Sequence, residues 1–69
     1  MRLCTIGVDV GGTNIKLGLV ASSGRIIAKT NLVTKTYAHH PRHLIDALVA
    51  AIHALIQENG KTIKDIAGI

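Results

Sequence analysis

The hydrophobic residues of this chain change their spacing along its first half. Residues 3–10, LCTIGVDV, form a nearly continuous apolar run rich in β-branched side chains, which is typical of a strand buried on both faces. Residues 15–21, IKLGLVA, alternate between larger apolar and other side chains and predict a second strand. SSG at 22–24 is a turn sequence, with Gly24 suited to a positive φ, and RIIAKTNLVT then predicts a third strand. Three strands joined by short turns predict an antiparallel meander.

The second half of the chain predicts one amphipathic helix and the beginning of a further strand. Pro41 suits the first turn of a helix and Gly60 suits its C-terminal end. Apolar residues between them recur with a period of about 3.6, so we expect a helix over residues 41–59 that packs its apolar stripe on the sheet. The stripe consists of Leu44, Ile45, Leu48, Val49, Ile52, Leu55 and Ile56. Residues 63–69, IKDIAGI, begin a fourth strand, which is expected to run parallel to residues 3–10.

Composition limits what these residues do alone. The chain has 69 residues, 48% of them hydrophobic, and its single aromatic residue is Tyr37, so it can form one small core at most. Chains this short bury too little surface to be comfortably stable, and Cys4 has no partner for an internal disulfide. We therefore expect residues 1–69 to be an incomplete domain that forms a homo-oligomer or associates with the rest of a longer chain. The edge of residues 3–10 is the expected contact, because unpaired strand edges recruit other strands.

The charge pattern suggests an anionic ligand without identifying it. The net charge is +4, and five basic residues with no intervening acidic one lie between Asp9 and Asp46. These are Lys16, Arg25, Lys29, Lys35 and Arg42. Nucleic acid is disfavoured, because proteins that read single strands stack bases on aromatic side chains and this chain has only Tyr37. A phosphorylated small molecule and a simple solvated face both stay open.

Other sequence signals concern the compartment. Cys4 lies in an apolar run and is interpreted as a buried, inert thiol, since reactive thiolates need an electropositive, partly exposed setting. The longest apolar helical stretch, residues 44–56, contains Asp46 and His53 and is too short to cross a bilayer. The N-terminal residues lack the apolar segment of a secretory signal. These features predict a cytoplasmic protein without a membrane partner.

The segment GVDVGGTN, residues 7–14, carries the candidate chemistry. A turn that passes close to phosphate oxygens needs residues without Cβ, so that amides reach the anion and φ can be positive. Gly11 and Gly12 meet this need, and Thr13 adds a hydroxyl donor. Bare phosphate would repel Asp9, so a cation is expected between them, and Mg²⁺ commonly bridges carboxylates to nucleotide phosphates. The alternative is a plain hairpin turn in which Asp9 accepts hydrogen bonds from turn amides.

These residues also carry a family resemblance. Residues 6–20, IGVDVGGTNIKLGLV, followed by SSGRIIAK, resemble the N-terminal phosphate-binding hairpin of the ROK family (repressors, uncharacterised reading frames and sugar kinases), especially its glucokinase-type members. The resemblance covers essentially the whole chain and does not distinguish one sugar from another. It implies an α/β fold of the ribonuclease H-like, actin-like ATPase kind. The expected half-domain has a three-stranded antiparallel meander, a helix and the start of a parallel fourth strand.

The resemblance implies an ATP-dependent sugar kinase that uses ATP and Mg²⁺ and phosphorylates glucose or a related hexose. It places Asp9 beside metal-bound ATP and brings a set of hairpin residues near its phosphates. That set comprises Gly11, Gly12 and Thr13, with Asn14 and Lys16 as weaker candidates. An exposed strand lysine is the alternative interpretation of Lys16.

The resemblance also implies that part of the catalytic machinery lies elsewhere. The general base of the family, its adenosine-binding segment and its zinc site cannot be placed in residues 1–69. No catalytic residue is therefore assigned here. Since phosphoryl transfer depends on positioning and electrostatic stabilisation together, we expect the segment alone to be inactive.

Two other functions stay open. A sugar-responsive repressor of the same family is disfavoured, because such repressors normally carry a winged helix ahead of the hairpin, where this sequence has only residues 1–5. A stand-alone interaction module would be favoured if the chain folds as a stable monomer. His39, His40 and His43 are interpreted as solvated loop residues, because zinc sites need three or four converging ligands.

Overall fold

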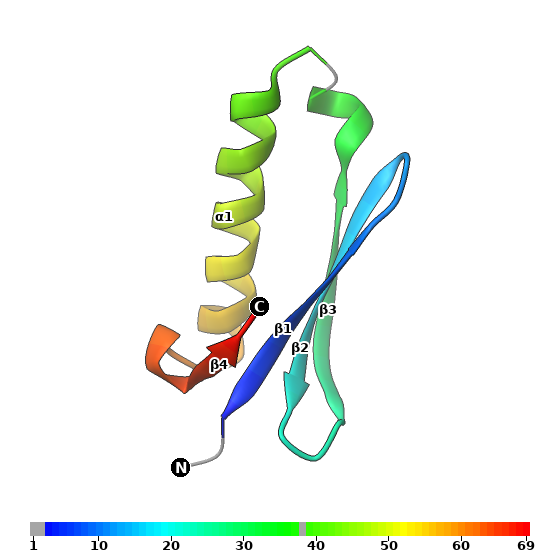
Figure 1. Ribbon diagram of the computed structural model, residues 1–69. Helices are drawn as coiled ribbons and strands as arrows, with labels where there is room; N and C mark the ends of the chain where they lie inside the picture. The colour runs from blue at the N-terminus through cyan, green and yellow to red at the C-terminus, as the bar shows by residue number, and fades with distance from the viewer. Residues whose placement is uncertain (1–2, 38) are drawn as a thin grey trace.

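The protein consists of one sheet with one long helix along it (Figure 1). The computed structural model describes residues 3–37 and 39–69. Its strands are β1 (Cys4–Val10), β2 (Asn14–Ala21), β3 (Ile26–Val33) and β4 (Ile66–Gly68). The helix α1 spans Pro41–Glu58, and two short 3-10 helices, η1 (Thr34–Tyr37) and η2 (Ile63–Asp65), flank the connections to it.

The strand order confirms the predicted topology. The sheet runs β3-β2-β1-β4, with β1, β2 and β3 successively antiparallel and β4 parallel to β1. Strand β4 is short, and its register pairs Cys4 with Ile66 and Thr5 with Gly68, so it covers only the beginning of β1. The α/β fold with meander, helix and parallel fourth strand is thus confirmed, and it is consistent with half of an actin-like ATPase domain.

The core lies on one face of the sheet, between the strands and α1. Its buried members are Cys4, Ile6, Ile15, Leu17, Leu19, Leu55 and Ile56. They alternate along β1 and β2 because successive strand side chains point to opposite faces. The prediction that residues 3–10 are buried on both faces is wrong, since Thr5, Gly7 and Asp9 are exposed. The reason is that α1 covers one face only.

The apolar stripe of α1 is wider than the surface that covers it. Leu55 and Ile56 are buried, and Leu44, Leu48 and Ile52 pack against the core. Ile45 is 57% exposed and Val49 is 49% exposed, so the prediction that the whole stripe packs on the sheet is wrong for these two residues. A 3.6-residue period produces a broad apolar arc, and a sheet of this width contacts only part of it.

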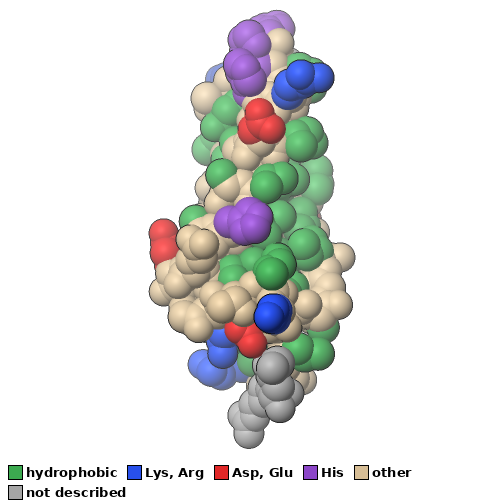
Figure 2. Space-filling model, turned by 90° about the vertical axis from the view of Figure 1, so that its left-hand side faces the viewer, with side chains coloured by type: hydrophobic (Ala, Val, Ile, Leu, Met, Phe, Trp, Pro, Cys, Tyr) green, Lys and Arg blue, Asp and Glu red, His purple; other side chains and the backbone are tan. Residues whose placement is uncertain are grey.

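The face of the molecule that carries α1 shows apolar side chains together with scattered charged and histidine side chains (Figure 2). Histidine side chains gather at the end of the molecule that holds the helix N-terminus, and apolar side chains lie along the helix below them. Among the residues that the structure describes, α1 included, no helix has both the length and the apolar character required to cross a membrane.

Glycine and proline residues mark the ends of several elements, as predicted. Gly24, in the β2–β3 turn, has φ 91°, and Gly60, just after α1, has φ 71°, so both occupy the left-handed region that favours glycine. Pro41 lies in the first turn of α1 as expected. The predicted helix over residues 41–59 therefore differs from the observed one by a single residue.

Candidate functional site

The β1–β2 hairpin presents the sequence-predicted residues at its tip. The antiparallel register runs to the pair Val10 and Ile15, and the Gly11 amide then donates to the Asn14 carbonyl oxygen at 2.8 Å. Gly12 and Thr13 are left at the apex of the turn. The tip lies at the end of the sheet away from the β2–β3 turn (Figure 1).

The structure contradicts one of the two reasons predicted for the glycines, the positive φ. Neither Gly11 nor Gly12 has a positive φ, so the expectation that the turn needs that conformation is wrong. A Cβ on Gly11 would lie 3.1 Å from the Asn14 carbonyl oxygen, and the tightness of the turn itself therefore favours glycine there. A Cβ on Gly12 would meet nothing within 4 Å, so contacts within the described residues give no reason for glycine at this position.

The amides at the apex have free hydrogen-bonding capacity. Within residues 3–37 and 39–69, neither the Gly12 nor the Thr13 amide donates to a protein acceptor. Both residues are exposed, so these donors face solvent or a ligand. Exposed neighbouring amides without protein partners are the kind of donor that binds phosphate oxygens.

A shallow hollow of about 190 Å³ lies beside these amides. It is lined by Asp9, Gly11, Thr13, Asn14 and Lys16. The structure therefore brings together five of the six predicted site residues, and Gly12 stands at the adjoining apex. Asp9 and Lys16 reach the hollow from opposite positions of the β1–β2 ladder, where they are register partners.

The chemistry of this set fits a magnesium-bound phosphate group. Mg²⁺ is usually held by one or two carboxylates together with water and substrate phosphates, so Asp9 alone is a sufficient protein ligand. Thr13 and Lys16 add a side chain with a hydroxyl donor and a side chain with a positive charge to the residues that line the hollow. All of these side chains except the half-buried Asn14 are exposed, which keeps the site accessible.

Two residues of the β3 side support the tip and were missed by the sequence analysis. The Thr34 amide donates to the Thr13 carbonyl oxygen at 3.0 Å, which ties the apex to the end of β3. The Asn31 side-chain amide donates to Asn14 Oδ1 at 3.0 Å, and Asn14 Nδ2 donates to Thr13 Oγ1 at 2.9 Å. The only sequence signal was a polar residue within a strand, which does not specify a partner.

Comparison with known proteins identifies the family to which this hairpin belongs. Residues 5–69 match the ROK family. The chain belongs to the ROK family. The sequence-based resemblance to that family is thereby confirmed.

Two curated relatives resemble part of this ROK chain. Both are called Glucokinase, one from Streptomyces coelicolor and one from Streptomyces lividans, and each is 40% identical over 48 residues. The match covers 70% of this chain and 14% of each glucokinase, so the chain spans a small part of the length of its relatives. No solved structure matches this ROK chain.

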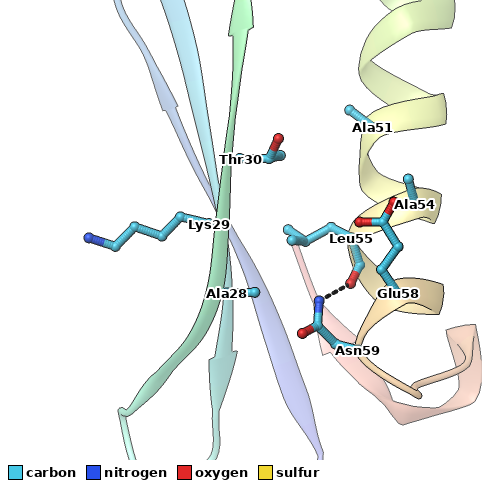
Figure 3. Close-up of a pocket in the computed structure, with 8 residues that line it drawn as sticks. All are labelled: Ala28, Lys29, Thr30, Ala51, Ala54, Leu55, Glu58 and Asn59. Atoms are coloured by element: carbon cyan, nitrogen blue, oxygen red, sulfur yellow. Dashed lines mark hydrogen bonds between the residues drawn. The ribbon is translucent and has the colours of Figure 1, made fainter.

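A larger hollow of about 390 Å³ lies elsewhere in the ROK chain, between β3 and α1 (Figure 3). Small side chains create it, with Ala28 on the strand and Ala51 and Ala54 on the helix. Asn59 is occupied in donating from Nδ2 to the Leu55 carbonyl oxygen at 2.7 Å, while the Lys29 side chain points away from the hollow. The residues that line it include none of the predicted site residues, whereas five of them line the hairpin hollow.

The histidines of the ROK chain form a separate feature. The rings of His40 and His43 stack with centroids 5.0 Å apart. His40 directly precedes α1 and His43 lies within it, so the interpretation of His43 as a loop residue is wrong. Among the described residues, no group of three or more histidine, cysteine or acidic side chains is placed to hold a metal ion. A magnesium site at Asp9 would therefore depend on phosphate and water for its other ligands.

Proposed function

We propose that this chain is the N-terminal phosphate-binding segment of an ATP-dependent sugar kinase, and that residues 1–69 form part of a larger actin-like ATPase lobe. The observation that supports this most directly is the pair of amides at Gly12 and Thr13, which have no acceptor among the described residues, at the apex beside a hollow that Thr13 and Asp9 both line. Donors and a carboxylate in one hollow suit a ligand that combines an anion with a cation. Magnesium-bound ATP is such a ligand.

The hairpin residues take different roles in this proposal. Gly12 and Thr13 donate amide hydrogens to phosphate oxygens, and the Thr13 hydroxyl adds a third donor. Asp9 holds the magnesium ion directly or through water, and the ion supplies charge neutralisation between the phosphates. Lys16 adds positive charge at the rim. Gly12 keeps the apex free of a side chain, so that phosphate oxygens reach the backbone.

A kinase fits better than a repressor for this chain. Both relatives described above are glucokinases, and the residues that match the ROK family include the whole hairpin tip. The acceptor in the proposal is accordingly glucose or a related hexose. The segment itself supplies half of a phosphate clamp and no general base, so it binds without catalysing transfer.

The test measures binding and turnover separately. The ¹⁵N-labelled 69-residue chain is titrated with ATP in the presence of Mg²⁺, and the Gly12 and Thr13 amide resonances are expected to move. For turnover, residues 1–69 replace the matching part of the Streptomyces coelicolor glucokinase, and glucose-dependent ATP consumption is measured. Asp9→Asn is expected to lower this turnover by at least about 100-fold, because it removes the carboxylate that holds the charge-neutralising magnesium ion.

A matched control separates the effect of the position of Asp9 from the effect of removing one negative charge. Asp46→Asn removes the same charge from the exposed surface of α1 and should leave both magnesium-dependent binding and turnover unchanged. Equal effects of the two substitutions would show that Asp9 has no special role. Resonance shifts confined to residues outside the hairpin would contradict the proposed site itself.

A further inference from the structure

We propose that Asn31 is a positioning residue, which fixes the direction in which the Thr13 hydroxyl donates its hydrogen. The inference rests on the proposed function, because the acceptor of that hydrogen is a phosphate oxygen. It adds to the site a residue of β3 that neither touches the ligand nor belongs to the hairpin motif. The link between the two residues is the Asn14 side chain.

The three side chains form a directed chain of hydrogen bonds. Asn31 Nδ2 donates to Asn14 Oδ1 at 3.0 Å, and Asn14 Nδ2 donates to Thr13 Oγ1 at 2.9 Å. The β2–β3 register explains why they meet. Asn31 lies opposite Lys16, and Asn14 lies two residues away from Lys16 on the same face of β2, so the two asparagines are diagonal neighbours.

The direction of this chain is set by the orientation of Asn31, which presents its amino group to Asn14. One end of the Asn14 side chain only accepts hydrogen bonds and the other only donates them. Because Asn31 presents a donor, the oxygen of Asn14 turns towards β3 and its amino group turns towards Thr13. The Thr13 oxygen then accepts a hydrogen bond, and its own hydrogen is left for a different acceptor.

That hydrogen is the part of Thr13 that matters for phosphate. Phosphate oxygens at neutral pH are acceptors, so a hydroxyl helps only when it donates. Without Asn31, the Asn14 carboxamide is free to rotate and present its oxygen, which would capture the Thr13 hydrogen. Asn31 thus biases the site towards anion binding without contacting the anion.

The backbone of the tip is held by a different contact. The Thr34 amide donates to the Thr13 carbonyl oxygen at 3.0 Å, and the Gly11 amide donates to the Asn14 carbonyl oxygen at 2.8 Å. Neither bond involves the Asn31 side chain. Substitution of Asn31 is therefore expected to change the orientation of the hydroxyl and to leave the position of the loop unchanged.

The experiment is a double-mutant cycle on the 69-residue chain and on the glucokinase hybrid described above. The probes are inorganic tripolyphosphate and ATP, each with Mg²⁺. The readout is the dissociation constant from the shift of the Gly12 amide, which every variant of the cycle retains, or, in the hybrid, the KM for ATP. Asn31→Ala is expected to weaken binding by about three- to tenfold, the value of one hydrogen bond. In a Thr13→Val background the same substitution should have no further effect.

Control variants separate this relay from a loss of structure. Thr30→Ala alters the neighbouring residue of β3, whose side chain points towards α1, and should bind as wild type does (Figure 3). If Asn31→Ala does not fold, Asn31→Asp replaces it. The aspartate only accepts, so Asn14 turns its amino group to β3, and the loss of binding is again expected to depend on the Thr13 hydroxyl.

The outcomes distinguish the relay from the proposed function. If the wild-type chain binds the probes and the Asn31→Ala variant binds them equally tightly, the relay is overturned and the proposed phosphate site is unaffected. Equal losses on Asn31→Ala in the wild-type and Thr13→Val backgrounds also overturn it, because Asn31 would then act independently of the hydroxyl. Absence of binding at the hairpin in both wild-type proteins overturns the proposed function and the relay with it.

Discussion

Substitution of Gly12 separates the requirements of the fold from those of the ligand. Gly12 does not have a positive φ, and a Cβ at this position would meet no described atom within 4 Å, so Gly12→Ala causes no clash within the described chain. At a site where the backbone is compatible, such a change stabilises a protein by about 0.4–1 kcal/mol, since the unfolded chain loses freedom. We therefore expect Gly12→Ala to raise the free energy of unfolding slightly.

The same methyl group should harm phosphate binding. If phosphate oxygens contact the Gly12 and Thr13 amides, the methyl group enters a close contact. Overpacking of that kind costs about 1–3 kcal/mol, which corresponds to a rise of about 5- to 160-fold in the dissociation constant. Stability and affinity are thus predicted to change in opposite directions.

Two assays on one variant decide the matter. Urea denaturation followed by circular dichroism gives the free energy of unfolding, and titration of the ¹⁵N-labelled chain with Mg²⁺ and ATP gives the affinity. Gly24→Ala is the control at the other end of the sheet. The φ of 91° at Gly24 disfavours a side chain, so the Gly24→Ala variant should lose about 1 kcal/mol or more of stability. The affinity of its folded form for ATP should equal that of wild type.

A Gly12→Ala chain that binds ATP as tightly as wild type would refute the reasoning. It would show that no ligand atom comes close to the apex. A marked loss of stability in Gly12→Ala would refute the structural premise, because the methyl group would then have met an obstacle.

Two further predictions concern the fold. Leu19 is 0% exposed, so Leu19→Ala should lower the free energy of unfolding by about 2–5 kcal/mol. Ile45 is 57% exposed, so Ile45→Ala should change it by less than about 0.5 kcal/mol in the same denaturation assay. Equal changes in the two variants would contradict the placement of the core. The Thr62 amide donates to the Asp65 carboxylate at 2.8 Å and holds the pKa of Asp65 below its ordinary value of 3.8, with the Thr62 hydroxyl and the charge of Lys61 acting in the same direction. The stabilisation by Asp65 should therefore be complete above about pH 4 and disappear as the pH falls through the folded pKa. The measurement is the difference in the free energy of unfolding between wild type and Asp65→Asn as a function of pH. A difference that does not shrink in acid would contradict the prediction.

Local chemistry made most of the fold predictable from the sequence. Turn residues at Gly24 and Gly60 and a proline at the first turn of the helix placed the ends of three elements. Their effect is confined to neighbouring residues, so one sequence suffices to interpret them. The hairpin motif was also recognisable, because Asp9 and the following glycines lie within six residues.

The faces of the elements were less predictable, because hydrophobicity shows what is able to be buried and not what covers it. Residues Thr5 and Gly7 made the first strand look continuous, yet they face away from α1. Val49 likewise belongs to the helical stripe and lies beyond the reach of the sheet. Burial at such positions depends on packing elements that periodicity does not reveal.

The Asn31 contact depended on a register that the sequence did not specify. The β2–β3 ladder shifts between Leu19 and Val20, so that Leu19 pairs with Ala28 while Val20 pairs with Ile26. A shift of one residue moves every later side chain to the opposite face of the strand. Without the shift, Thr30 in place of Asn31 would share a face with Asn14, and the relay to Thr13 could not form.

The core and the hairpin tip occupy different ends of β1, and this affects how the molecule fluctuates. Cys4 and Ile6 are buried near β4, whereas Val10, next to the tip, is 71% exposed. Amide hydrogens at the tip therefore exchange through local opening, and those of the core strands exchange only when the whole sheet separates. A single deuterium-exchange time course therefore reports ligand binding at the apex through the tip amides and cooperative unfolding through the core-strand amides.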